Sequence, residues 1–183
     1  MSKKWDIRFL ALAEHVAQWS KDPSTKCGAV ITIGKKIISL GYNGFPTEIQ
    51  DKEYLYERRE DKYPRVIHAE VNAVLYAGGR QQDATLYTYP IIPCSECSKF
   101  IIQAGLDRCV SFEPFRGDGE DLAERANLKL SRELFEEAEI EITLYTEKEH
   151  AKCEDGRPRG LREDYSGREH RLWEDYATAY STG

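Results

Sequence analysis

The chain has 183 residues, 40% of them hydrophobic and 11% aromatic, with a net charge of −6 at pH 7. The acidic balance argues against a broad surface for polymeric nucleic acid, which normally needs basic side chains, and no segment is apolar enough for a signal peptide or a membrane span. We therefore expect a cytoplasmic protein without a membrane partner, with one folded domain over residues 1–147 and a polar tail over residues 148–183. The five scattered cysteines fit reduced thiols or a metal site better than a disulfide framework.

The first part of the chain predicts a helix, a hairpin and a long polar segment. Apolar residues at helical intervals predict a helix over residues 5–20, which Lys21-Asp22-Pro23 ends. Two β-rich runs, CGAVITI and KIISLGY, flank Gly34-Lys35 and predict an antiparallel hairpin. Residues 47–65 are polar and show no clear period, so we interpret them as a functional loop.

The rest of the chain alternates between helices and strands. One helix starts near His68 and ends at Gly78-Gly79, and another opens at Pro93 and runs to Gly105. The first of these helices is followed by the strand ATLYTYP and the second by the strand RCVSF. After the loop EPFRGDGED, the pattern is completed by a further helix and the strand EIEITLYT. The five strands predict a mixed sheet whose parallel crossovers are right-handed. Near the end of the polar tail, RLWEDYATAY is a candidate docking helix.

Four residues at the starts of two predicted helices have the chemistry of a catalytic zinc site. His68 offers an imidazole, and Cys94 and Cys97 offer thiolates whose deprotonation the first-turn amides favour. Zinc accepts such a set and keeps a fourth position for water, whose pKa would fall to about 7. Glu70 does not share a helix face with His68, so it is a poor fourth ligand and a candidate proton shuttle beside the bound water.

Simpler explanations exist for each element of this site. A lone Cys-x-x-Cys is more often a structural half-site, and a lone histidine before a helix is usually a cap. A structural zinc would need a fourth ligand, and Cys27 and Cys109 lie in predicted strands where burial as small hydrophobes is favoured. His150, Cys153 and His170 lie in the charged tail. The joint pattern of all four residues favours the catalytic site.

The spacing H-x-E followed by P-C-x-x-C is the signature of zinc deaminases. Around it, the blocks WSKDPSTKCGAVI, GYNGFP, KYPRVIHAEVNAV and PCSECSKFIIQAGLDRCVSF stand in the order found in deoxycytidylate deaminases. Residues 20–112, about half of the chain, therefore resemble that family. The resemblance weakens after Phe112, and the long cysteine-bearing insertions of some phage members are missing.

The resemblance implies a cytidine-deaminase-like three-layer α/β fold, a mixed five-stranded sheet with helices on both faces. It implies deamination of dCMP to dUMP and ammonia by a zinc-bound hydroxide, with Glu70 moving the protons, as a supply for thymidylate synthesis. It further implies a homohexamer activated by dCTP with Mg²⁺ and inhibited by dTTP. The substrate-binding candidates are Lys21, Lys26, Asn43 and Ala69. The candidates for the triphosphate site are Gly41, Tyr42, Asn43, Gly44, Phe45, Asp51, Phe115 and Arg116.

Several alternatives stay open from the sequence. Lys21 and Lys26 flank DPST and could bind a phosphate, or they could be ordinary surface charge. A different deaminase of the same superfamily, acting on a free nucleoside, guanine or transfer RNA adenosine, is the alternative enzyme. A zinc-stabilised binding module without turnover is the alternative of another class, and replacing Glu70 would leave the function of such a module intact.

Overall fold

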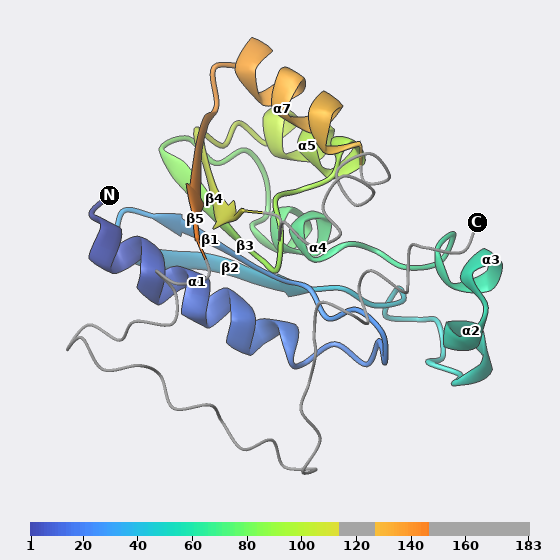
Figure 1. Ribbon diagram of the computed structural model, residues 1–183. Helices are drawn as coiled ribbons and strands as arrows, with labels where there is room; N and C mark the ends of the chain where they lie inside the picture. Colours follow the sequence, from blue (N-terminus) through green and yellow to red (C-terminus); the bar gives the residue numbers. More distant parts are fainter. Residues whose placement is uncertain (114–126, 147–183) are drawn as a thin grey trace.

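The computed structural model describes residues 1–113 and 127–146, and its centre is a five-stranded sheet (Figure 1). The strand order is β2-β1-β3-β4-β5. β1 runs antiparallel to both of its neighbours, whereas β3, β4 and β5 are mutually parallel. The predicted mixed sheet of five strands is confirmed. The strands are β1 Gly28–Ile33, β2 Lys36–Tyr42, β3 Ala84–Tyr89, β4 Arg108–Phe112 and β5 Glu141–Tyr145.

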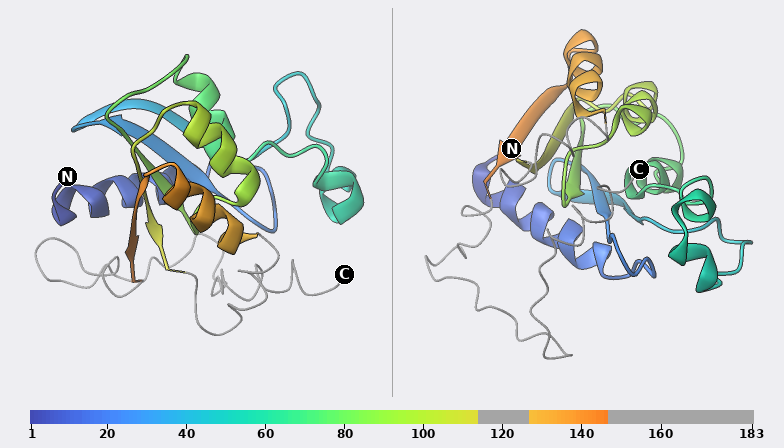
Figure 2. Two further views of the ribbon diagram at one scale, coloured as in Figure 1. Left: turned by 90° about the horizontal axis from the view of Figure 1, so that it is seen from above. Right: turned by 45° about the vertical axis from the view of Figure 1, so that its right-hand side comes forward.

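Helices cover both faces of the sheet, as expected (Figures 1 and 2). Helix α1, Lys3–Ala17, packs on one face, where Leu10 meets Val30 and Tyr87 in one apolar cluster. The other face carries α4 Ala69–Tyr76, α5 Ser95–Gln103 and α7 Leu128–Glu137, whose residues share a second cluster with Ile31 and Leu86. Successive residues of β1, such as Val30 and Ile31, thus point into opposite layers, as the pleat of a strand requires.

Two glycines set how closely the helices approach the sheet. A Cβ added at Gly28 in β1 would overlap the Ala13 carbonyl oxygen of α1. A Cβ added at Gly41 in β2 would overlap the Ala69 carbonyl oxygen of α4. Both helices therefore rest on bare backbone, from opposite faces and on neighbouring strands. The position of α4, which carries Glu70, depends directly on the contact at Gly41.

A buried carboxylate ties α1 to the parallel half of the sheet. Asp6 is 1% exposed and accepts hydrogen bonds from Tyr87 Oη at 2.8 Å and Tyr145 Oη at 2.9 Å. Arg108 donates to both carboxylate oxygens, at 2.9 and 3.0 Å, and also to Glu141 at 2.9 Å. One side chain of α1 is therefore bonded to β3, β4 and β5.

The observed helices differ from the predicted ones at three places. Helix α1 spans Lys3–Ala17 rather than 5–20, because Gln18, Trp19 and Ser20 bond to the carbonyl three residues back and tighten the chain. The polar segment 47–65 is not irregular throughout, since it contains α2 Tyr54–Glu57 and α3 Arg59–Lys62, each too short to show a period. Helix α5 begins at Ser95, and Pro93 and Cys94 precede it.

Some expectations fall outside the described residues. The end of the predicted domain at residue 147, the polar tail and its candidate docking helix all lie there, as does the loop over residues 114–126. Within residues 1–113 and 127–146, no helix combines the length and the apolar character needed to cross a bilayer.

Candidate metal centre

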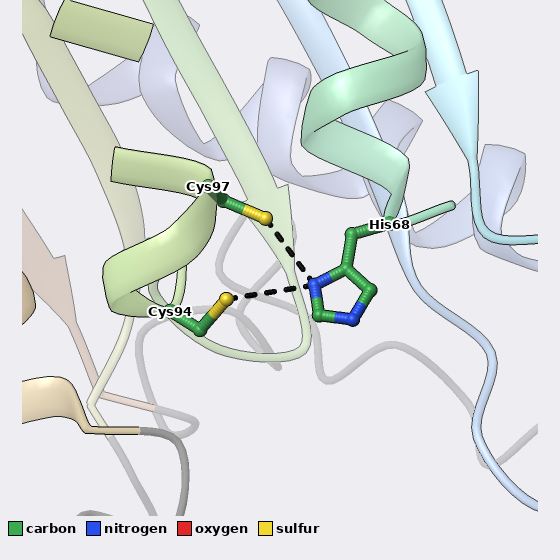
Figure 3. Close-up of side chains that lie close together, drawn as sticks. All are labelled: His68, Cys94 and Cys97. Carbon is green, nitrogen blue, oxygen red and sulfur yellow. Dashed lines mark hydrogen bonds between the residues drawn. The ribbon is translucent and has the colours of Figure 1, made fainter. Parts of the chain in front are cut away.

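The three predicted metal ligands come from the starts of two helices on the same face of the sheet. His68 and Cys94 are the residues immediately before α4 and α5, and both have extended backbones. Cys97 lies in the first turn of α5. Helices α4 and α5 pack against each other, so their beginnings bring the imidazole and both thiols together (Figure 3).

The distances within this group suit a tetrahedral zinc ion. His68 Nδ1 lies 3.2 Å from Cys97 Sγ and 3.5 Å from Cys94 Sγ, and the three ligand atoms lie within 4.8 Å of one another. Nitrogen and sulfur ligands on one tetrahedral zinc, with bonds of about 2.0–2.3 Å, would be about 3.5 Å apart. Cys97 is buried, Cys94 is half-buried and His68 is exposed, so one side of the group faces solvent.

Other cysteines and histidines of the described residues do not join this group. Cys109 is buried in β4, as expected for a small hydrophobe. Cys27 is half-buried and precedes β1, rather than lying in the strand as predicted. His150, Cys153 and His170 lie outside the described residues. Within the described residues, the group of candidate ligands therefore consists of His68, Cys94 and Cys97.

Hydrogen bonds within the group shift the pKa of each member. The bond from the Cys97 thiol lowers the pKa of Cys94 to about 4, so Cys94 is a thiolate, the form that binds metals. The bond to Cys94 raises the pKa of His68 to about 9, and the same sulfur raises the pKa of Cys97. A cation held by all three must displace the protons of His68 and Cys97, so binding releases protons.

Glu70 lies in the first turn of α4, buried next to the ligands. Burial raises the pKa of its carboxyl group, although the nearby charge of His68 opposes the shift. A raised pKa brings a carboxyl group closer to the operating pH, which favours a role as general acid and base.

Two buried hydroxyl groups support the metal-ligand turn from behind. Ser131 Oγ, on α7, donates to the Pro93 carbonyl at 2.7 Å, and Ser98 Oγ, on α5, donates to the Cys94 carbonyl at 3.0 Å. The two hydroxyl oxygens lie 2.7 Å apart. Both side chains are fully buried. Sequence reasoning missed this support, because isolated serines in helices carry no local signal of their partners.

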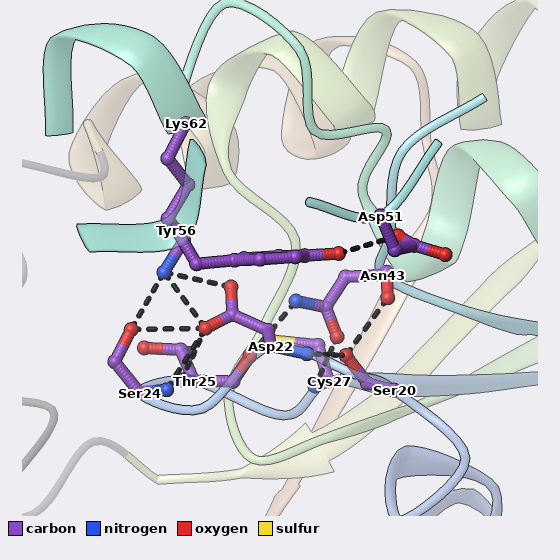
Figure 4. Close-up of polar contacts among 9 residues, drawn as sticks. All are labelled: Ser20, Asp22, Ser24, Thr25, Cys27, Asn43, Asp51, Tyr56 and Lys62. Carbon is purple, nitrogen blue, oxygen red and sulfur yellow. Dashed lines mark hydrogen bonds and ion pairs between the residues drawn. The ribbon is translucent and has the colours of Figure 1, made fainter. Parts of the chain in front are cut away.

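Asn43, a substrate candidate at the end of β2, is held by the loop before β1 (Figure 4). Its Nδ2 donates to the Thr25 carbonyl and its Oδ1 accepts from the Cys27 amide, both at 2.8 Å. The next residue, Gly44, pairs with Ile67 through two backbone hydrogen bonds. Asn43 therefore lies between the loop over residues 20–27 and the segment that delivers His68.

A buried ion pair that was not predicted lies behind this loop. Lys62, at the end of α3, contacts both carboxylate oxygens of Asp22, at 2.7 and 2.8 Å, and Ser24 Oγ at 2.6 Å (Figure 4). The side chains of Lys62 and Asp22 are 6% and 1% exposed. Both residues stand in the quoted blocks SKDP and KYP, but no local pattern connects two residues 40 positions apart.

The two predicted phosphate-binding lysines each have a partner in the structure. Lys21 is 70% exposed and forms an ion pair with Asp51 at 2.7 Å. Lys26 donates to the Ser20 carbonyl at 2.6 Å. The structure therefore joins a substrate candidate, Lys21, to a candidate of the triphosphate site, Asp51. Ala69, the remaining substrate candidate, is buried between His68 and Glu70.

The candidates for the triphosphate site have varied surroundings. The Phe45 ring stacks on Tyr56 with centroids 4.5 Å apart, and Tyr56 Oη donates to Asp51 at 2.7 Å. Tyr42 is exposed and its ring meets Trp19 edge-on. Gly41 lies under α4 and Gly44 pairs with Ile67, so both have structural contacts of their own. Phe115 and Arg116 lie outside the described residues.

Comparisons with known proteins give a consistent result. A sequence model of the family described as the cytidine and deoxycytidylate deaminase zinc-binding region matches residues 3–113. An uncharacterized deaminase in the luxG 3′ region of Aliivibrio fischeri is 38% identical over 78% of this chain and 95% of its own length. The deoxycytidylate deaminase of Mus musculus is 32% identical over 79% of this chain and 82% of its own length. The dCMP deaminase of cyanophage S-TIM5, solved in complex with dCMP and dUMP, has the same fold, with a TM-score of 0.59. It is 24% identical to this chain, and the match covers 79% of this chain and 99% of the phage chain.

Proposed function

Because the chain belongs to the cytidine and deoxycytidylate deaminase family, we propose that it hydrolyses dCMP to dUMP and ammonia. The observation that carries this proposal is the group formed by His68 Nδ1 and the sulfurs of Cys94 and Cys97, with a buried Glu70 in the adjoining helix turn. The relatives named as deoxycytidylate deaminases support dCMP as the substrate.

The residues of the site divide the chemistry between them. His68, Cys94 and Cys97 would hold zinc, which would supply Lewis-acid activation of water near neutral pH. Glu70 takes a proton from the attacking water and places it on the ring nitrogen beside the reacting carbon. It then passes the second water proton to the departing amino group, which leaves as ammonia. One water is consumed, and the carbon–nitrogen bond is replaced by a carbonyl group.

The substrate is proposed to lie between the metal ligands and Asn43. The Asn43 side chain would bind the sugar hydroxyl, and Ala69, whose side chain is buried, would contribute through its backbone. Lys21 and Lys26 are the candidates for the phosphate, and each would have to exchange its present partner for it. Surface charge remains the alternative for Lys21, given its exposure.

Control by nucleotide triphosphates is the finer part of the proposal. In a homohexamer, dCTP with Mg²⁺ would activate and dTTP would inhibit, through the candidates Gly41 to Phe45, Asp51, Phe115 and Arg116. An effector can only do so by binding the active and inactive arrangements unequally. The proposed setting is the cytoplasm, where the dUMP product would supply thymidylate synthesis.

The proposal is tested by incubating the purified protein with cytosine nucleotides and identifying the products by mass spectrometry. We expect dUMP from dCMP, and Glu70→Gln should keep about one zinc per chain while losing at least about 100-fold in turnover. Glu136→Gln, at an exposed position on α7, is the matched control and should be fully active.

Three outcomes would contradict the proposal. Comparable turnover in Glu70→Gln would remove Glu70 from its role. Deamination of a free nucleoside, guanine or transfer RNA adenosine in place of dCMP would assign the chain to another activity of the superfamily. Zinc-dependent stability with no turnover of any of these compounds would indicate a binding module.

A further inference from the structure

We infer that Lys62 and Asp22 are positioning residues for substrate binding, which act through Asn43 and do not touch the substrate. The inference rests on the proposed function, because Asn43 is the proposed sugar contact. It assigns a role to the segment over residues 47–65, which holds Lys62 and has no part in the zinc chemistry.

Lys62 has no capacity left for a ligand of its own. A lysine ammonium group has three protons to donate. The Lys62 Nζ atom contacts both oxygens of Asp22 and Ser24 Oγ, all within 2.8 Å, which accounts for all three (Figure 4). Its positive charge is neutralised by Asp22 and buried. Lys62 therefore acts on Asp22 and is not a phosphate ligand.

Asp22 in turn fixes the loop that holds Asn43. Its Oδ1 atom accepts from the amides of Ser24 at 2.9 Å and Thr25 at 3.1 Å. The carbonyl of the same Thr25 accepts from Asn43 Nδ2, and the Cys27 amide donates to Asn43 Oδ1. The orientation of the Asn43 amide thus depends on how the loop wraps around Asp22.

The connection closes into a ring next to the metal ligands. The amides of Arg65 and Val66 donate to the Lys62 carbonyl, both at 3.0 Å, and Ile67 pairs with Gly44, the neighbour of Asn43. The ring runs from Lys62 through Asp22, the loop and Asn43 to Gly44 and Ile67, and back along the chain to Lys62. His68 follows Ile67 directly, so the same ring places Asn43 relative to His68, a candidate metal ligand.

The Lys62–Asp22 ion pair is better suited to fixing geometry than to adding stability. A buried ion pair gains little net stability over apolar residues of similar size, because desolvation offsets the attraction. Its bonds are directional, however, and they join two segments that no strand pairing holds together. The pair is therefore suited to fixing the shape of the loop that holds Asn43.

The test compares Lys62→Met, Asp22→Asn and the double variant. Each single variant leaves a buried charge unpaired and should lower Tm by about 10 °C. The double variant should regain most of this loss, because both charges are gone and the Asp22→Asn side chain still offers an oxygen to the Ser24 and Thr25 amides. The double variant therefore lacks the contacts of the ion pair but keeps most of the wild-type stability, so a change in its kinetics cannot be attributed to a loss of stability.

In the double variant, KM for dCMP should remain raised by about 10-fold, as expected for one misplaced hydrogen bond, while kcat changes little. The zinc content should stay near one per chain. Adding Asn43→Ala to the double variant should cause little further increase in KM, because the effects of substitutions at residues that act through one another are not additive. Lys129→Met, in an exposed ion pair with Glu133 on α7, is the control and should keep the wild-type KM and Tm.

A double variant with the wild-type KM would overturn the inference and leave the pair a purely structural contact, while the proposed function would stand. Wild-type protein that does not turn over dCMP would overturn the proposed function and this inference with it. If the single variants fail to fold, the double variant and the Asn43→Ala combination decide the question alone.

Discussion

Two aspartates of this molecule, Asp6 and Asp22, are each 1% exposed and each paired with a cation, yet they lie in different kinds of structure. Asp6 is bonded to side chains of β3, β4 and β5, which are already joined by strand pairing. Asp22 is bonded to its own loop and to one lysine of a distant segment. The same chemistry therefore reinforces a scaffold in one place and holds a loop to a distant segment in the other.

The two aspartates should therefore differ in what their removal changes, either the stability of the fold or the geometry of the candidate site. Helix α1 and Asp6 lie on the face of the sheet opposite α4 and α5, whose beginnings bring the candidate metal ligands together. Removing Asp6 should weaken the whole fold without moving the site. Removing the Asp22 pair should move the site, because no ladder of strands keeps the loop and the segment over residues 47–65 in register.

The largest effect on stability is expected for Asp6→Asn. The substitution leaves Arg108 and two tyrosines without their carboxylate, which should lower the free energy of unfolding by about 3 kcal/mol, the low end for a broken buried pair, because Glu141 still binds Arg108. Chemical denaturation measures the loss. The kcat/KM of the folded protein should stay within about twofold of wild type if the scaffold and the site are separate. A large fall in kcat/KM at full zinc content would contradict the view that Asp6 supports the scaffold without affecting the site.

Gly28→Ala and Gly41→Ala form a matched pair that sharpens the comparison. Each adds a methyl group against helix backbone, and overpacking of this kind should lower the free energy of unfolding by about 1–3 kcal/mol. Only Gly41→Ala displaces α4 and with it Glu70, so it should also lower kcat by about 10-fold or more. Gly28→Ala displaces α1 and should leave kcat near wild type. Equal kcat values in the two variants would show that the position of α4 does not limit the reaction.

The smallest effect is a dependence of stability on pH. Burial would raise the pKa of Asp6, but the bonds from Arg108, Tyr87 and Tyr145 outweigh it, and the pKa lies below its ordinary value. The folded protein then binds fewer protons here than the unfolded chain, so this stabilisation is present above about pH 4 and is lost as the pH falls through the folded pKa. The difference in unfolding free energy between wild type and Asp6→Asn should therefore narrow below pH 4. A difference that stayed constant down to pH 2 would contradict the role of the ionised carboxylate.

The parts that could be predicted are those with a local signal. The five strands have β-rich runs between turn residues, and the candidate metal ligands stand at the starts of two helices, which the sequence predicted. Helices α2 and α3 have four residues each and leave no period to detect. The pairs Asp6–Arg108 and Asp22–Lys62 join residues 102 and 40 positions apart, so only the folded chain shows them. The sequence predicts Lys21 and Lys26 as phosphate-binding candidates because they flank DPST, whereas the lysine buried against this loop is Lys62.

The hydroxyl groups of Ser98 and Ser131, behind the turn that holds Cys94, have fewer protons than short contacts. The two hydroxyl groups hold two protons, but three short contacts need one each: to the Cys94 carbonyl, to the Pro93 carbonyl and between the hydroxyls. In any one arrangement, one of the three contacts therefore lacks a proton. The carbonyls of Pro93 and Cys94 thus share two hydroxyl protons from two different helices, so the backbone around Cys94 is tied to α7 as well as to its own helix α5.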